Sequence, residues 1–397
     1  MKKTNDKIPE DWEVVKLGDD SLFELIMGQS PPSAFYNKEG KGLPFLQGNA
    51  EFGEIIPIPT IFCSKPSKTS KPGDILISVR APVGDINLAK EKYCIGRGVG
   101  AIRIKNDVDN LFLFYSLKFS KRNLESISGG STFKAITKKQ VENIKISFPP
   151  LPEQQAIARV LSTIDDAIQK TDEIVEKTER LKKGVMRDLF KDMELVPLVN
   201  YCEEKNDIVA GPFGSNLKVS DYIGVGVPII RLQNIERNKF IEKDIKYISK
   251  EKANELKYHS YKPGDLVLAK LGDPIGKTCI IPNSMPEGIV VADVVRIRVS
   301  KSKAIPIFVE YALNSNSCIN QLKKETIGST RPRVNIIQIR NLKVPHFELP
   351  QQQKIASILS TIDKKIELER KRKRRLERIK KGLMNDLLTG RKRVKIW

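Results

Sequence analysis

Residues 272–278, Gly-Asp-Pro-Ile-Gly-Lys-Thr, are the part of the chain that comes nearest to a catalytic motif, a phosphate-binding loop. Such a loop needs four residues between its glycines, so that backbone N–H groups wrap the phosphates, and a helix must follow it. Only three residues separate the glycines here, and residues 279–282 continue as a predicted strand. The similar residues 82–85 lack the Lys-Thr pair. We therefore predict a turn and exclude a nucleotide site.

Two other kinds of catalysis also lack the residues they need. Methyl transfer to adenine requires a glycine-rich cofactor loop and a polar-Pro-Pro-aromatic element that holds the flipped base. Residues 148–151, Phe-Pro-Pro-Leu, are a near miss, and consecutive prolines are better explained as a rigid lead into a helix. Asp74 and Asp265 each follow a glycine but lack the acid-x-Lys spacing of a nuclease metal site. Both are predicted to cap turns.

The cysteine and histidine content argues against a metal or disulfide framework. Five cysteines are scattered without a C-x-x-C pair, and the chain has only two histidines. The first residues are polar, and no stretch approaches 18 apolar residues. We expect a reduced, cytoplasmic protein with no metal and no membrane partner.

The charge of the chain points to a polyanionic partner. Sixty-nine Lys and Arg against 48 Asp and Glu give a net charge of +21, for which nucleic acid is the commonest partner. Residues 349–397 hold 16 basic and 5 acidic residues, whereas residues 151–192 hold 8 and 9. The two segments therefore have opposite charge tendencies.

These two segments are copies of each other. With an offset of 198 residues, 151–190 and 349–388 share 20 of 40 positions, including Leu-Ser-Thr-Ile-Asp in both. A period near 200 residues is too long for a solenoid, whose units run to about 50. The chain is therefore predicted to be two tandem copies of one large module.

Each copy is predicted to be one long helix, because a proline in its first turn is followed by about 36 residues without another proline. Apolar residues recur every three or four positions, as in a coiled-coil seam. If the helices pack antiparallel, the six consecutive basic residues at 370–375 lie near the acidic residues of the other helix. The residues that carry this prediction are Ile157, Leu161, Ile164, Ile168, Thr171, Val175 and Thr178, with Ile355, Leu359, Ile362 and Ile366, and the acids Asp172, Glu173, Glu176 and Glu179.

The regions between the helices repeat more faintly. Pro-Gly-Asp at 72–74 matches 263–265, and Gly-Ser-Thr at 130–132 matches 328–330. β-rich runs at 74–79, 265–269 and 290–297 predict strands, and residues 110–124 and 306–324 predict helices. The expected fold is mixed α/β (α+β), with globular domains at 1–150 and 193–348, helices at 151–192 and 349–390, and a basic tail at 391–397.

Taken together, these features resemble the specificity subunits of type I restriction-modification enzymes. The resemblance rests on the doubled Leu-Pro-x-Gln-Gln helix, on residues 28–32 and 211–215, and on the tail 387–394. It implies two target recognition domains that each read half of a bipartite, asymmetric DNA site, on two long antiparallel helices. Catalysis would belong to partners: two modification subunits that use S-adenosylmethionine, and restriction subunits that use ATP and Mg. No cofactor is then expected in this chain, which would not be an enzyme.

DNA reading is expected from polar and basic loop residues, since Arg pairs with guanine edges and Asn or Gln with adenine. Repeated positions suit scaffold or phosphate contacts, and divergent ones suit specificity. The candidates are Gln29, Ser30, Tyr36, Gln47, Asn49, Arg80, Arg97, Ser131, Thr132 and Lys134 in the first domain, and Ser215, Asn216, Arg231, Gln233, Asn234, Lys270, Lys277, Arg331, Arg333 and Asn335 in the second.

The helices are expected to dock partners and to set the spacing of the half-sites. At 1.5 Å per residue, about 37 residues span roughly 55 Å, an upper bound of about 16 base pairs. An orphan specificity protein, a stand-alone methyltransferase and a structural coiled-coil protein remain as alternatives. The apolar partner-binding candidates are Leu181, Val185, Met186, Leu189, Ile379, Leu383, Met384, Leu387 and Leu388.

Overall fold

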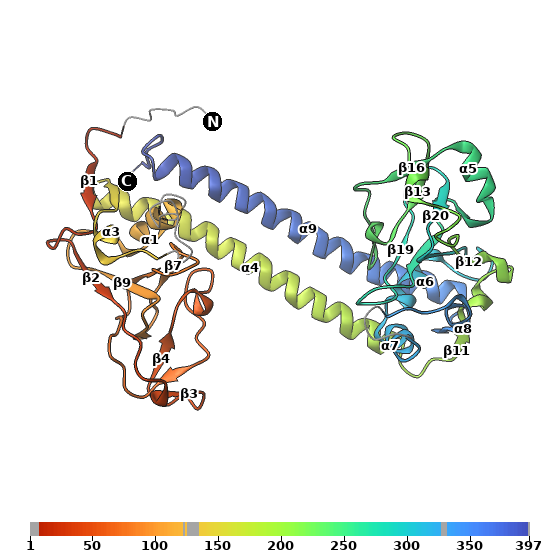
Figure 1. Cartoon of the computed structure of the whole chain (residues 1–397), viewed down its shortest axis with the longest axis horizontal. Coiled ribbons are helices and arrows are strands. Elements are labelled where there is room, and N and C mark those ends of the chain that lie inside the picture. The colour runs from red at the N-terminus through yellow and green to blue at the C-terminus, as the bar shows by residue number, and fades with distance from the viewer. Residues whose placement is uncertain (1–7, 122–123, 125–134, 327–331, 396–397) are drawn as a thin grey trace. The chain divides into compact units, whose positions relative to one another are not determined.

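The computed structural model describes residues 8–121, 124, 135–326 and 332–395. The chain forms two compact units (Figure 1). Unit 1 comprises Met1–Glu173 and Arg370–Trp397, and unit 2 comprises Ile174–Glu369. Each unit therefore contains one globular domain and about half of each long helix. The long helices are α4 (Leu151–Leu189) and α9 (Leu349–Leu387), each of 39 residues.

The domain of unit 1 is built on two four-stranded sheets with the orders β2-β9-β6-β7 and β3-β5-β4-β8. The first sheet is antiparallel, and the second contains one parallel pair, β4 with β8. A separate pair, β1 with β10, leads into α4. The elements are β1 (Glu13–Lys16), β2 (Phe23–Met27), β3 (Tyr36–Asn37), β4 (Leu43–Leu46), β5 (Phe62–Cys63), β6 (Ile75–Ser78), β7 (Ile86–Leu88), β8 (Cys94–Ile95), β9 (Val99–Ile104), α1 (Asn110–Phe119), α3 (Lys138–Glu142) and β10 (Lys145–Phe148).

The domain of unit 2 repeats this plan. Its sheets have the orders β12-β21-β18-β19 and β16-β13-β20-β17, the second again with one parallel pair, and β11 with β22 leads into α9. Its elements are β11 (Leu195–Pro197), β12 (Ile208–Ala210), β13 (Val227–Ile230), β14 (Ile235–Glu236), β15 (Lys239–Phe240), β16 (Lys246–Ile248), α5 (Lys250–Glu255), β17 (Ser260–Tyr261), β18 (Leu266–Ala269), β19 (Thr278–Ile280), β20 (Gly288–Val290), β21 (Val294–Ile297), α6 (Pro306–Leu313), α7 (Asn316–Lys324), α8 (Ile336–Asn341) and β22 (Lys343–Pro345).

The mixed α/β fold and the doubled helix are confirmed, with one difference in the strands. Residues 290–297 form two strands rather than one run, because the chain turns at 291–293 and passes from one sheet to the other. The turn is closed by the Val294 N–H, which donates to the Val291 carbonyl at 2.9 Å. The domain of unit 1 makes the same crossing at 96–98, between β8 and β9.

The turn predicted at 272–278 is also confirmed. Gly276 has a positive φ of 77°, and β19 follows it directly instead of a helix. Gly84 is the counterpart, with a φ of 85°. Asp74 and Asp265 cap the turns before β6 and β18, since each accepts a backbone N–H from three residues earlier. Each also pairs with an arginine, Arg103 or Arg298, which accounts for both carboxylates structurally.

The two long helices pair antiparallel within each unit, as their charge pattern predicted. In unit 1, Lys373 of α9 binds Asp172 of α4 at 2.6 Å, and Lys380 binds Asp165. In unit 2, Lys182 of α4 binds Asp363 of α9 at 2.7 Å. The seam residues near the start of each helix also serve the domains, because Ile157 and Leu161 share a core with α1, and Ile355 and Leu359 share one with α6.

A polar joint fixes the domain of unit 1 on the helices. The Tyr115 hydroxyl of α1 donates to Asp165 of α4 at 2.8 Å, and the Lys380 ammonium of α9 binds the same carboxylate and lies 5.7 Å from the Tyr115 ring centre. Burial and this carboxylate raise the pKa of Tyr115. Gln154 adds a second tie by accepting the backbone N–H of Asp109, the residue that caps α1. The domain is therefore held by both helices.

Unit 2 has the same joint in equivalent residues. The Tyr311 hydroxyl of α6 donates to Asp363 of α9 at 2.8 Å, and Lys182 of α4 binds that carboxylate. Gln352 accepts the backbone N–H of Ile305, as Gln154 does from Asp109. In each unit the lysine comes from the helix whose C-terminal half lies there.

Candidate nucleic-acid interface

The candidate reading edge of unit 1 is formed by loops between its two sheets. Ser30 connects two of them, because its hydroxyl donates to the Gln47 side chain at 3.2 Å and accepts the Arg97 backbone N–H at 3.1 Å. The loop at 79–84 joins the same edge, since the Val79 N–H donates to the Gly98 carbonyl. Exposed Arg80 pairs with Ala135 across an isolated bridge. Ser30, Gln47, Arg80 and Arg97 are therefore brought together.

Two arginines of this edge are exposed to solvent. Arg80 and Arg97 are exposed and form no ion pair with another residue that the structure describes. Gln29 is also exposed, whereas Tyr36 is turned inward, with its hydroxyl bound to the Pro31 carbonyl and its ring 4.6 Å from Phe45. Asn49 lies at the start of a short helical turn at the same edge and is half-buried.

The edge of unit 2 uses the same backbone with different side chains. The Lys270 N–H donates to the Asp293 carbonyl, Leu271 pairs with Arg333, and the Arg333 guanidinium binds the Asp293 carboxylate at 3.0 Å. Burial lowers the pKa of Lys270. Arg231 and Gln233 line the same hollow as Asp293, which has a volume of about 290 Å³. The structure therefore gathers Lys270, Arg231, Gln233 and Arg333.

Acidic residues are also part of this second edge. The sequence did not predict them, because only polar uncharged and basic side chains were expected to contact DNA. Asp244 accepts from Arg231 and from Gln233, each at 2.9 Å, and Lys246 also binds it. These donors hold the pKa of Asp244 well below its usual value. Glu236 pairs with Lys277 at 2.8 Å. A carboxylate suits the amino group of cytosine, so this edge offers acceptors as well as donors to base edges.

Several candidates have structural tasks instead. Asn234 is fully buried, donates to the Ile241 and Lys243 carbonyls and accepts the Arg231 N–H, so it cannot touch a base from this position. Asn335 caps α8 in a reciprocal pair of hydrogen bonds with Gln338. Ser215 and Asn216 are exposed. Ser131, Thr132, Lys134 and Arg331 lie outside the described residues.

The apolar candidates on the helices fall into two groups. Leu181 and Ile379 occupy equivalent positions in the two copies and expose 58% and 46% of their surface. Leu387 and Leu388 are buried in the core of unit 1, which removes them from any partner surface. The others pack half-buried against the cores of their units: Val185, Met186 and Leu189 in unit 2, and Leu383 and Met384 in unit 1.

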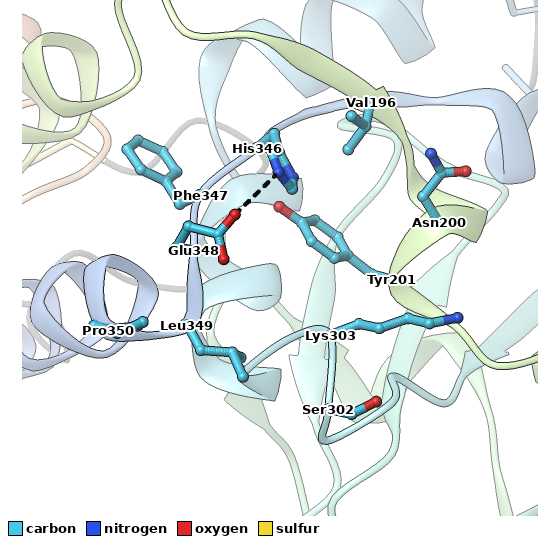
Figure 2. A pocket seen from close by; sticks show the side chains of 10 residues that line it. All are labelled: Val196, Asn200, Tyr201, Ser302, Lys303, His346, Phe347, Glu348, Leu349 and Pro350. Carbon is cyan, nitrogen blue, oxygen red and sulfur yellow. Dashed lines mark ion pairs between the residues drawn. The ribbon is translucent and has the colours of Figure 1, made fainter.

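A second hollow, of about 400 Å³, lies at the start of α9 in unit 2 (Figure 2). His346 stacks on Tyr201, and its Nε2 lies 4.0 Å from Glu348, while Lys303 donates to the Cys202 carbonyl. Figure 2 shows His346 directed toward Glu348, with Ser302 among the other residues that line the hollow. This hollow belongs to the joint between domain and helix.

The described residues also hold no group of three or more His, Cys, Asp or Glu side chains that could ligate a metal ion. All five cysteines are buried and free, and burial raises the pKa of Cys202 and Cys318 to about 12. Within the described ranges, no helix has the length and apolar character needed to cross a membrane.

Comparison with known proteins identifies the family. Residues 9–179 and 215–378 match the type I restriction modification DNA specificity domain. The type I restriction enzyme MjaVIII specificity subunit of Methanocaldococcus jannaschii is 30% identical, over 98% of this chain and 95% of its own length. A putative type I restriction enzyme specificity subunit, MjaX, of the same organism is 56% identical, over 46% of this chain and 44% of its own length.

A solved structure supports the fold over the whole chain. The crystal structure of a type I restriction-modification system S subunit from M. genitalium covers 98% of both chains with a TM-score of 0.62 and 18% sequence identity. Since the family match covers both modules, the chain belongs to the type I restriction-modification DNA specificity family.

Proposed function

We propose that the two domains read the two halves of a bipartite, asymmetric DNA site, and that the helices set the spacer between these halves. As a member of its family, the chain is a DNA sequence-recognition subunit of a restriction-modification system and not an enzyme. The observation that carries the proposal is the pair of reading edges with one backbone plan and different side chains. Arg80 and Arg97 stand at the first edge, and Arg231 with Asp244 stands at the second.

The difference between the edges predicts that the half-sites differ in sequence. A dimer of identical readers binds a palindrome, because its two surfaces are the same. Here the backbone hydrogen bonds of the two edges repeat, whereas the side chains differ. The Val79 N–H donates to the Gly98 carbonyl in unit 1, and the Lys270 N–H donates to the Asp293 carbonyl in unit 2. Asp293 adds a carboxylate where Gly98 has no side chain. Two fused, divergent domains thus suit an asymmetric site.

The helices are proposed to dock two modification subunits. Leu181 and Ile379 lie 198 residues apart at matching positions, and each is an exposed apolar side chain on a helix. Equivalent surfaces on the two copies suit two identical partners. We infer that these subunits bind S-adenosylmethionine, and that restriction subunits, where present, bind ATP and Mg.

The test is methylome sequencing of a host that expresses this chain with its neighbouring modification subunit, against a host with that subunit alone. The expected result is a bipartite, asymmetric adenine motif that appears only with this chain. Absence of a motif despite co-purification would indicate an orphan protein. Absence of both would contradict the proposed assembly.

A further inference from the structure

Phe213 is an exposed aromatic residue of unit 2, near the second edge. It lies in the segment Gly211-Pro212-Phe213-Gly214-Ser215 and exposes 82% of its surface. Single apolar residues on a surface are ordinary, so exposure alone assigns no role. Two further observations point to a ligand: the backbone hydrogen bonds that hold the loop, and the residues beside it.

Backbone hydrogen bonds and a close backbone approach hold the loop that carries the ring. The Gly211 N–H donates to the Val294 carbonyl at 2.9 Å, and a Cβ on Gly211 would lie 2.0 Å from the Val291 carbonyl oxygen, so only glycine permits this approach. Pro212 and Leu217 on either side of the ring are buried. The Asn216 N–H closes the turn by donating to the Phe213 carbonyl at 2.9 Å. The ring is therefore presented outward by an anchored turn.

The anchored turn adjoins the second reading edge. Pro212 lines the hollow of about 290 Å³ together with Arg231, Gln233 and Asp293. These three side chains offer both donors and acceptors for base edges. Phe213 follows Pro212 directly in the chain, so it adjoins a residue that lines this hollow.

Unit 1 differs at the equivalent position. Gly28 takes the place of Gly211, because its N–H donates to the Val99 carbonyl as that of Gly211 does to Val294. Two residues later stands Ser30, whose hydroxyl is bonded to Gln47 and to the Arg97 backbone. The first domain thus has a small, inward-bonded residue where the second has an outward aromatic ring.

We propose that Phe213 is a wedge that enters duplex DNA at one half-site and unstacks a base step there. The proposal rests on the DNA-reading function above. Apolar side chains inserted between base pairs cost a few kcal/mol of stacking, which the extra protein contact offsets. A phenylalanine ring carries about 150–250 Å² of surface for such contact. Duplex DNA is the ligand that fits this ring, because the adjoining side chains suit base edges and the chain carries a net charge of +21.

The experiment uses the full chain with its modification subunit and a duplex that bears the methylated motif. The fluorescent base 2-aminopurine is placed in turn at positions of each half-site other than the adenine that is flipped out for methylation and its two neighbours, and its signal rises where stacking is lost. With the unchanged protein, the rise should occur in one half-site only. Phe213→Ala should abolish that rise and weaken binding about 5- to 150-fold, the usual effect of losing one aromatic–base stack.

Two further variants control the result. Phe213→Trp should keep the rise, because it keeps an aromatic wedge. Val219→Ala changes another residue of the same domain, 79% exposed, and should leave signal and affinity unchanged.

Three outcomes would overturn the wedge. Phe213→Ala that keeps both signal and affinity would show that the ring does not enter DNA. Loss of the modification subunit from the Phe213→Ala chain, with duplex binding by the chain alone intact, would show a protein contact instead. Failure of the unchanged protein to bind the duplex would refute the DNA-reading function itself, a distinct result that also removes the wedge.

Discussion

Replacing Lys380 by methionine should destabilise unit 1 strongly, because it leaves a buried carboxylate without its cation. The Asp165 side chain is 4% exposed, and among the described residues it would keep the Tyr115 hydroxyl as a hydrogen-bond partner and Lys118 as a nearby positive charge. Removing one member of a buried ion pair costs about 3–5 kcal/mol. Methionine preserves most of the volume of the lysine stem, so lost packing adds little. This loss is a large share of the roughly 5–15 kcal/mol that stabilises a typical domain.

Lys182→Met is the matched control in unit 2, where the chemistry is the same and the burial is not. The Asp363 side chain is 33% exposed, so water replaces part of the lost interaction. Pairs at such exposure contribute about 1 kcal/mol or less. The double variant Lys380→Met with Asp165→Asn removes the charge while its amide oxygen still accepts from Tyr115, and it should recover most of the loss.

The assay is urea unfolding of the full chain followed by hydrogen exchange and mass spectrometry, which reports each unit by its own peptides. Lys380→Met should lower the midpoint for peptides of unit 1, and Lys182→Met should lower that of unit 2 much less. Equal losses in the two units would contradict the burial argument. A double variant no more stable than Lys380→Met alone would show that the loss does not come from the stranded charge.

Four further outcomes are expected. Leu181→Glu and Ile379→Glu should leave the unfolding curve unchanged and abolish co-purification with modification subunits, whereas Leu387→Glu should unfold unit 1, since Leu387 is a core residue; retained co-purification of both surface variants would exclude that docking face. Burial raises the pKa of Glu310 to about 7 from 4.5, so its stabilising contribution is complete below pH 4.5 and is lost as pH rises through 7, by about 3 kcal/mol. Urea unfolding at about pH 5 and pH 8 measures this loss of stability. Glu310→Gln leaves the neighbouring Asn238, Asp363 and Lys182 in place and should remove the contribution of Glu310 to the difference between the two pH values. A difference that stays the same in this variant would show that other groups cause it. Four residues inserted into both helices, between Asp172 and Lys182 and at the matching place in α9, should lengthen the spacer in the methylome by one or two base pairs and keep both half-site sequences, whereas an unchanged spacer would refute the ruler. Arg97→Ala should change base preference in one half-site only, by about 1–3 kcal/mol in binding competition between duplexes, and equal changes in both halves would contradict separate reading.

The long helices and their pairing could be predicted from sequence because their information is local and repeated. The regular spacing of apolar residues predicted the helices. The acidic residues around Asp172 and the basic residues around Lys373 predicted that the helices pair antiparallel. The polar joint was present in the same repeat but was not recognised. Asp165 with Asp363 and Lys182 with Lys380 are identical pairs, and unchanged polar residues in divergent copies are a usable signal of a shared bond.

The reading edges were harder to predict, because they depend on contacts between distant segments. Nothing near Arg231 indicates that Asp244 will bind it, and the turn at 291–293 looked like continuous strand in its β-rich surroundings. Polarity selected Asn234 and Asn335, but their bonds to backbone and to a helix cap are visible only in the fold. Composition identifies residues whose side chains suit base edges, whereas the fold decides which of them are exposed.

Residues 388–393 pack in the unit that also contains residues 11 and 12. Arg393 binds Asp11 and the buried carboxylate of Glu153, and Leu388 packs in the same core as Trp12. During synthesis, unit 2 therefore has all of its residues before unit 1 does, which reverses the usual order in which N-terminal domains fold first. A variant that stops after residue 369 should keep unit 2 folded and expose the domain of unit 1 to proteolysis.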